Sequence, residues 1–93
     1  MLPVPREDVI FKRLNDGAVV YHCSDEIYFG LNAGGARVWE LLPPVSGSLD
    51  DLVARIAREN PDTDVSRIRS DAEALLASLE ELGLVRAEAG PIP

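Results

Sequence analysis

The sequence predicts an α+β domain in which three short antiparallel strands precede three helices. Two observations predict this fold class. Runs rich in β-branched and aromatic residues, separated by short turn segments, fill the first third of the chain. The remainder carries apolar residues at helical spacing, between residues that typically cap helices. A chain of 93 residues, 46% of them hydrophobic, can form one domain with a modest core.

The strands are predicted at residues 8–14, 18–23 and 26–31. Asn15-Asp16-Gly17 joins the first two strands, and Gly17 is free to take a positive φ in a tight hairpin. Ser24-Asp25 joins the second strand to the third. Connections this short favour antiparallel neighbours, so we expect a meander.

The third strand has two distinct faces and one free edge. Period-two alternation places Ile27, Phe29 and Leu31 toward the core, and Tyr28 and Gly30 on the opposite face. Because this strand is the last of the meander, only one of its edges is paired. The other edge is open unless another segment covers it.

The first two helices have clear start and stop signals. The first begins after Asn32, a good N-cap, and ends at Pro43-Pro44. The second begins after Ser48, with Asp51 in a capping-box-like position, and ends at Asn60-Pro61. Each carries an apolar stripe that faces the core.

The third helix is predicted to be the longest element, from near Asp64 to Gly83, which supplies the C′ position. Its apolar side chains fall within an arc of about 120°. They are Val65, Ile68, Ala72, Leu75, Leu76, Leu79 and Leu82. An arc this wide can face both the core and a groove beside it. Residues 1–86 are therefore expected to form the domain, and residues 87–93, which have no periodicity, a flexible tail.

Charge and composition exclude several function classes. The net charge of −7, from 16 acidic and 9 basic residues, argues against nucleic acid as a partner. The single cysteine, Cys23, allows no internal disulfide, and no signal peptide or membrane-spanning run is apparent. We therefore expect a cytoplasmic protein that does not bind membranes.

Four motifs, in this order and spacing, resemble the PqqD family, whose members are RiPP recognition elements. They are Asp16-Gly17, Tyr28-Phe29-Gly30-Leu31-Asn32, Gly35-Ala36-Arg37-Val38-Trp39-Glu40-Leu41-Leu42 and Leu79-Glu80-Glu81-Leu82-Gly83-Leu84-Val85. The resemblance covers about residues 7–86. Within the family, the sequence is most similar to the free-standing leader-binding proteins of lasso peptide biosynthesis.

This resemblance implies a winged helix-turn-helix-like fold without catalytic residues or cofactors. It also implies that the leader segment of a precursor peptide adds as an antiparallel strand to the third strand, in a cleft against the third helix. The implied partners are a separate leader protease and a macrolactam cyclase. The acidic balance of the chain favours a leader that carries Lys or Arg, mainly through faster encounter.

The candidate peptide-binding residues come from the third strand with the turn before it and from the third helix. They are Asp25, Glu26, Ile27, Tyr28, Phe29, Gly30, Arg69, Asp71, Ala72, Leu75, Leu76 and Leu79. Leu75 and Leu79 are interpreted mainly as core, whereas Leu76 lies at the rim of the apolar arc beside Arg69 and is the favoured contact. Gly30 lacks a Cβ and lets a foreign backbone approach, with a bulge or kink as an equal alternative.

The remaining chemistry-bearing residues have structural interpretations. His22 and Cys23 are neighbours on a strand and point to opposite faces, so they form neither a catalytic pair nor a zinc site. Trp39 lies at an apolar helical position and is predicted to anchor the core. Gly34-Gly35 lacks the spacing of a phosphate-binding loop. We expect no enzyme activity and no metal or cofactor.

Three alternatives remain at this point. The first is a PqqD-like chaperone that serves a radical enzyme in pyrroloquinoline quinone biosynthesis or a related peptide modification. The second is a winged-helix DNA-binding protein, which the acidic third helix disfavours. The third is an interaction domain without a peptide ligand. A free strand edge can also pair with itself, which leaves a homodimer open.

Overall fold

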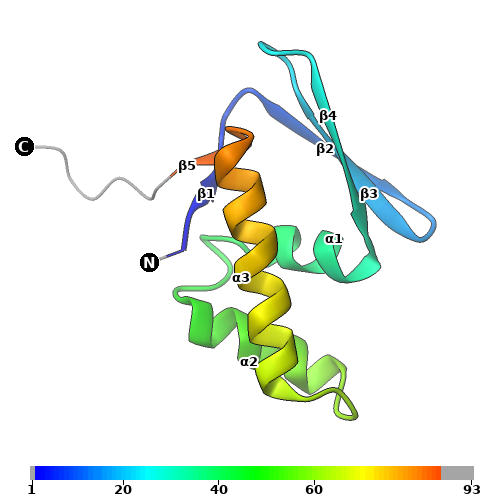
Figure 1. Ribbon diagram of the computed structural model, residues 1–93, viewed down its shortest axis with the longest axis vertical. Helices are drawn as coiled ribbons and strands as arrows, with labels where there is room; N and C mark the ends of the chain where they lie inside the picture. Colours follow the sequence, from blue (N-terminus) through cyan, green and yellow to red (C-terminus); the bar gives the residue numbers. More distant parts are fainter. Residues whose placement is uncertain (1, 87–93) are drawn as a thin grey trace, which may run out of the picture.

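The computed structural model describes residues 2–86, and it has the predicted α+β fold class (Figure 1). The elements are β1 (Val4–Pro5), β2 (Val9–Leu14), β3 (Gly17–His22), β4 (Ile27–Asn32), α1 (Ala33–Glu40), α2 (Leu49–Glu59), α3 (Val65–Glu81) and β5 (Val85–Arg86). The three predicted strands correspond to β2, β3 and β4 with ends shifted by one residue. The two-residue strands β1 and β5 were not predicted. The tail expected at residues 87–93 lies outside the described residues.

Strands β2, β3 and β4 form an antiparallel sheet in that order. The register places Phe11, Val20 and Phe29 side by side. These side chains belong to the face that α1 and α3 cover (Figure 1). The alternation predicted for the third strand is confirmed, because Leu31 is buried whereas the Tyr28 side chain on the opposite face is 71% exposed.

The hairpin between β2 and β3 requires Gly17 for a different reason from the one predicted. Gly17 does not take a positive φ; instead, a Cβ at this position would lie 2.1 Å from the carbonyl oxygen of Leu31 on the neighbouring strand. Close approach of two backbones, rather than turn geometry, therefore demands glycine. The left-handed conformation occurs in the next turn, where Glu26 has a φ of 54°.

The core lies between the sheet and the helices, and Trp39 of α1 is part of it. Its indole ring stacks on Phe11 with ring centroids 6.1 Å apart and planes within 3°, as expected for an anchor. Asn32 caps α1 as predicted, because its Oδ1 accepts a hydrogen bond of 2.7 Å from the amide of Gly35.

Helix α2 begins as the sequence indicates. The hydroxyl of Ser48 accepts a hydrogen bond from the amide of Asp51 (3.1 Å), and the Asp51 carboxylate accepts one from the amide of Gly47 (3.1 Å). The first bond satisfies an amide that the first turn leaves free, and the second ties the residue before the N-cap to the helix. Asp64 caps α3 in the same way by accepting from the amide of Ser66 (2.9 Å).

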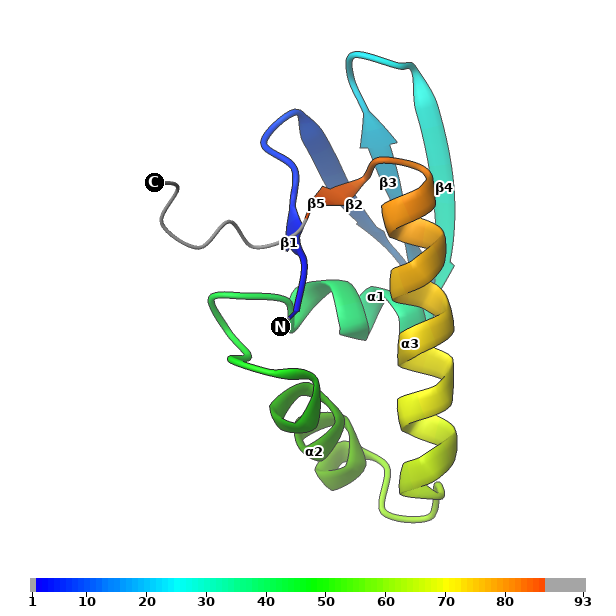
Figure 2. The same ribbon diagram turned by 60° about the vertical axis from the view of Figure 1, so that its left-hand side comes forward.

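Helix α3 ends in a Schellman motif around Gly83, which has a φ of 74°. The amide of Gly83 donates to the carbonyl of Glu80 (3.1 Å), and the amide of Leu84 donates to that of Leu79 (2.9 Å). The chain then turns back into β5, which pairs antiparallel with β1 (Figure 2). This pairing ties the start of the chain to the end of α3, and Leu2, which is 1% exposed, joins the core.

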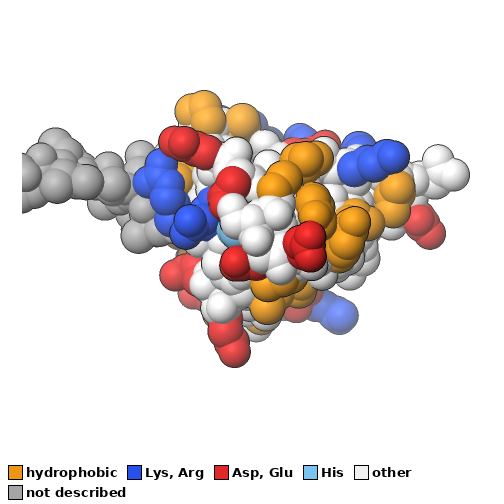
Figure 3. All heavy atoms as spheres, turned by 90° about the horizontal axis from the view of Figure 1, so that it is seen from above, with side chains coloured by type: hydrophobic (Ala, Val, Ile, Leu, Met, Phe, Trp, Pro, Cys, Tyr) orange, Lys and Arg blue, Asp and Glu red, His pale blue; other side chains and the backbone are white. Residues whose placement is uncertain are grey.

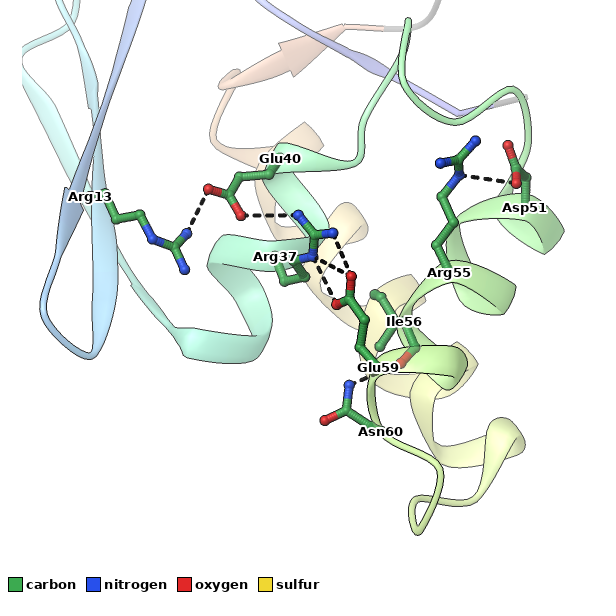
Figure 4. A network of polar contacts seen from close by, with 8 residues as sticks. All are labelled: Arg13, Arg37, Glu40, Asp51, Arg55, Ile56, Glu59 and Asn60. Carbon is green, nitrogen blue, oxygen red and sulfur yellow. Dashed lines mark hydrogen bonds and ion pairs between the residues drawn. The ribbon is translucent and has the colours of Figure 1, made fainter.

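An ion-pair network joins β2, α1 and α2 (Figure 4). The Arg37 guanidinium donates to the Glu59 carboxylate (2.8 Å and 3.0 Å), and it lies 3.5 Å from Glu40. Glu40 also accepts from Arg13 at 2.7 Å. Partly exposed pairs of this kind contribute little singly, but the bidentate geometry gives a specific link between α1 and the end of α2. No helix within residues 2–86 is long and apolar enough to cross a bilayer.

Candidate functional site

The outer edge of β4 is unpaired in the described part of the chain. β4 is the last strand of the sheet, and its register partners all belong to β3. Between Ile27 and Leu31, no backbone group bonds to another element of residues 2–86 outside that ladder. An exposed row of amide and carbonyl groups is a template for another extended segment.

A cavity of about 520 Å³ opens beside the C-terminal half of this edge. Its wall comes from the end of β4, the start of α1, the end of α2 with the following turn, and one flank of α3. The lining residues are Phe29, Gly30, Leu31, Asn32, Gly34, Gly35, Val38, Ile56, Asn60, Thr63, Ile68, Asp71, Ala72 and Leu75. Apolar side chains make up half of the set, glycines and uncharged polar residues supply most of the rest, and Asp71 is its only charged member.

The structure shows which flank of α3 faces the cavity. Asp71, Ala72 and Leu75 of the predicted site line it, and Leu75 lies about one helical turn after the other two on the same side. The opposite flank carries Arg69, whose guanidinium is paired with the Asp50 carboxylate at the start of α2. Arg69 therefore faces α2 and does not line the cavity.

The prediction that Leu76 lies at the rim is wrong. Its side chain is only 6% exposed and belongs to the core with Leu79, which is fully buried. Leu75 is half-buried and lines the cavity instead. A helix turns by 100° per residue, so adjacent leucines at the edge of a wide apolar arc face different surroundings. The sequence does not show which of the two edges of the apolar arc on α3 borders the sheet.

The N-terminal candidates lie farther from the cavity. Asp25 and Glu26 belong to the exposed turn between β3 and β4, and Ile27 and Tyr28 begin β4. None of these four side chains lines the cavity. They belong to the turn and the strand edge, whose main-chain groups rather than side chains are open to another segment.

Gly30 stands where the edge meets the cavity. It pairs with Val19 in an uninterrupted register, so it forms no bulge. A Cβ at this position would meet no atom within 4 Å. The backbone here is thus open to solvent, as the first of the two interpretations of Gly30 requires.

Sequence reasoning missed the part of the cavity formed by α1 and α2. Gly34-Gly35, in the first turn of α1 just after the strand, is the one signal that could have located it. A Cβ on Gly35 would lie 3.3 Å from Asn32 Oδ1 and 3.4 Å from Leu75 Cδ2. Glycine therefore lets Leu75 approach the start of α1. Ile56 and Thr63 contribute through the packing of α2 and carry no local signal.

His22 has a structural role at the other end of β4. It is 3% exposed, its Nδ1 accepts a hydrogen bond of 3.1 Å from the amide of Asp25, and its Nε2 lies 3.4 Å from Asp8 Oδ2. The ring thus holds the turn that precedes the open edge. Cys23 is exposed, which confirms that the two residues point to opposite faces. Residues 2–86 hold no cluster of three or more His, Cys, Asp or Glu side chains fit for a metal.

A small α+β domain with an open strand edge beside an apolar cavity belongs to the class of folds that can accept an extended peptide. The chain itself belongs to the PqqD family. The profile described as "Coenzyme PQQ synthesis protein D (PqqD)" matches residues 17–85. This match confirms the resemblance noted in the four sequence motifs.

Among solved structures, the chain is similar to TbiB1 in complex with the TbiA(beta) leader peptide. The two are 26% identical, the TM-score is 0.80, and the alignment covers 94% of this chain and 99% of the other. The structural similarity thus covers nearly the whole chain, more than the residues that the family profile matches. A search of curated proteins gave no match.

Proposed function

We propose that this chain binds the leader segment of a ribosomally made precursor peptide and presents it to separate maturation enzymes. The leader adds as an antiparallel strand along β4, with an apolar side chain in the cavity. The observation that carries this proposal is that the unpaired edge and the cavity meet at the same place, near Gly30. The similarity to TbiB1, a protein solved with a leader peptide, supports it.

Two kinds of contact contribute to the proposed binding. Main-chain hydrogen bonds along β4 supply affinity for almost any extended sequence. Side chains of the added strand alternate, so every second one points toward α3, where Phe29, Ile68 and Leu75 surround the cavity. Fully burying one leucine-sized side chain contributes about 1.5–3 kcal/mol before ordering costs. Selectivity therefore resides in residues spaced two apart in the peptide.

Binding and presentation need no chemistry from this chain. The lining of the cavity contains neither a nucleophile paired with a base nor a basic side chain that would bind phosphate. The proposed role is that of an adaptor without enzyme activity. The bond-breaking steps belong to its partners.

We propose a leader protease and a macrolactam cyclase of a lasso peptide pathway as these partners. The near-complete overlap with TbiB1 favours this version. The family profile favours a second candidate, a PqqD-like chaperone for a radical enzyme, because its printed description refers to coenzyme PQQ synthesis. Incubation of the leader complex with each enzyme class, followed by mass spectrometry of the precursor, separates the two.

Titration of a synthetic leader peptide into ¹⁵N-labelled protein tests the proposed site. We expect amide shifts concentrated in residues 27–32 and 68–75, and new protection of β4 amides from hydrogen exchange. Shifts centred on β1 and the start of α2 instead would place the peptide elsewhere. The same spectra test self-association through the open edge, because line widths of the free protein would then rise with concentration and fall when leader is added.

A further inference from the structure

The sheet has a second exposed surface, on the face that the helices do not cover. We call it the outer face. Its outward-pointing residues are Ile10, Lys12 and Leu14 of β2, Val19 and Tyr21 of β3, and Tyr28 and Gly30 of β4. Ile10 is 56% exposed, Leu14 47% and Tyr28 71%.

These residues lie in neighbouring rows across the three strands. The register aligns Ile10, Tyr21 and Tyr28, and the two tyrosine rings have centroids 4.5 Å apart. In the view from above, hydrophobic side chains gather in a band over the half of the molecule that the strands occupy (Figure 3). A solvated sheet face normally carries polar residues, whereas exposed apolar patches with tyrosine mark interaction surfaces.

The charge of the outer face differs from that of the whole chain. Lys12 is the only charged residue among the outward positions of the three strands, although the net charge is −7. A second copy of this chain fits poorly, because the outward positions of the same face hold no carboxylate that could pair with Lys12. A partner with a carboxylate among apolar side chains fits well.

We propose that the outer face docks a second protein, whose complement is an apolar patch that includes a carboxylate opposite Lys12. This inference rests on the proposed function, because the second protein is taken to act on the peptide bound at the β4 edge. A peptide added at the β4 edge lies in the plane of the sheet, whereas a protein docked on the outer face lies on one side of that plane. Peptide and protein therefore bind at the same time and do not compete.

A pair of matched variants tests this proposal. Ile10→Thr combined with Lys12→Glu removes the apolar side chain and reverses the charge, while a β-branched residue keeps strand propensity. The control is Val65→Thr, because Val65 is similarly exposed (51%, against 56% for Ile10) but lies at the start of α3. The probes are the purified protease and cyclase encoded with the precursor, each measured by biolayer interferometry with the leader present.

We expect the double variant to weaken binding of one of these enzymes by about tenfold or more. The control variant and the affinity for the leader alone should stay within about twofold of the unmodified chain. Equal enzyme binding by the double variant, or no binding of either enzyme to the unmodified chain, would overturn the outer-face proposal. Loss of leader binding by the unmodified chain would instead overturn the proposed function, so the two failures are distinguishable.

Lys12 is the only lysine in the sequence, which allows a direct check of the contact. A carbodiimide joins its amine to a carboxylate of the partner only when the two are in contact. We expect a crosslink that maps to Lys12 in the complex. It should disappear in Lys12→Arg, which keeps the charge and the binding but removes the primary amine. A crosslink at the amino terminus alone would contradict the proposed surface.

Discussion

Two adjacent residues on α3 show how finely the site depends on helix phase. Leu75 and Leu76 have the same chemistry, yet Leu75 lines the cavity while Leu76 is buried in the core. A single step of 100° separates them. Substitutions at the two positions should therefore affect different properties of the protein.

We expect Leu75→Glu to weaken leader binding by about 1–3 kcal/mol with the fold retained, because it places a charge against an apolar anchor. Leu76→Glu should unfold the domain, since the same charge would be buried without a partner. Calorimetric titration and circular dichroism measure the two effects. Ala74→Glu is the control, because Ala74 is exposed on the same helix. A folded Leu76→Glu variant with lost binding would restore Leu76 as the contact.

Two glycines of the sheet should respond to alanine with opposite signs. Gly17→Ala forces a Cβ to within 2.1 Å of the Leu31 carbonyl oxygen and should destabilise the fold by about 1–3 kcal/mol. Gly30→Ala meets open space and should stabilise it by about 0.4–1 kcal/mol through the unfolded chain. Urea unfolding gives both values. An unchanged stability for Gly17→Ala would show that the hairpin relaxes freely.

At the scale of elements, local signals in the sequence were sufficient where the cause is local. The caps at Asn32, Ser48 and Asp64 and the C′ glycine at position 83 satisfy backbone groups within one turn, so they fix helix ends without knowledge of the fold. The strand boundaries follow for the same reason from alternation and turns.

The features that the sequence did not predict depend on tertiary packing. β1 and β5 have only two residues each and exist because the end of α3 brings Val85 beside Pro5. The cavity requires α2 to be held against α1, and its lining residues Ile56 and Thr63 show no pattern of their own. The need for glycine at Gly17 was predicted but attributed to a positive φ. The actual cause is a close approach of two backbones, which depends on the tertiary structure and cannot be read from the sequence.

The caps and ion pairs of the helices make stability depend on acid pH. The pKa of Asp51 is lowered chiefly by the amide of Gly47, that of Asp64 by the amide of Ser66, and that of Glu59 by Arg37. A carboxyl group with a depressed pKa in the folded state stabilises the fold above its unfolded pKa, near 3.8 for Asp and 4.5 for Glu. This contribution is lost as the pH falls through the folded value.

We therefore expect the free energy of unfolding to decline steadily as the pH falls from about 5 toward 3. Glu59→Gln should show a shallower decline than the unmodified chain, because it removes one of the titrating groups. Asp62→Asn is the matched control, since no hydrogen bond or ion pair involving Asp62 occurs within the described chain. Urea unfolding at a series of pH values measures the slopes. Identical slopes for all three proteins would show that Glu59 has the same pKa in both states.

On the scale of the whole molecule, the domain extends beyond the part that the family profile matches. The profile begins at residue 17, yet Leu2 is in the core and β1 pairs with β5. The N-terminal segment thus closes the molecule on the side of α3 away from β4 (Figure 2). The outer edge of β4 therefore stays unpaired in the part of the chain that the structure describes, while the pairing of β1 with β5 holds the opposite side of the fold together.

The overall charge of the chain bears on how the proposed leader would reach the site. With a net charge of −7 and Asp71 as the only charged residue lining the cavity, we expect faster association with a leader that carries Lys or Arg. The contacts proposed for the bound state are main-chain hydrogen bonds and apolar burial, which salt affects little.

Raising the salt from about 50 to 500 mM should therefore slow association several-fold and leave dissociation nearly unchanged. Stopped-flow fluorescence of a labelled leader measures both rates. Asp71→Asn should reduce the salt dependence of association, whereas Glu81→Gln, at the far end of α3, should alter it less. An association rate that does not change with salt would remove charge from the account of recognition and leave strand pairing and the cavity as its basis.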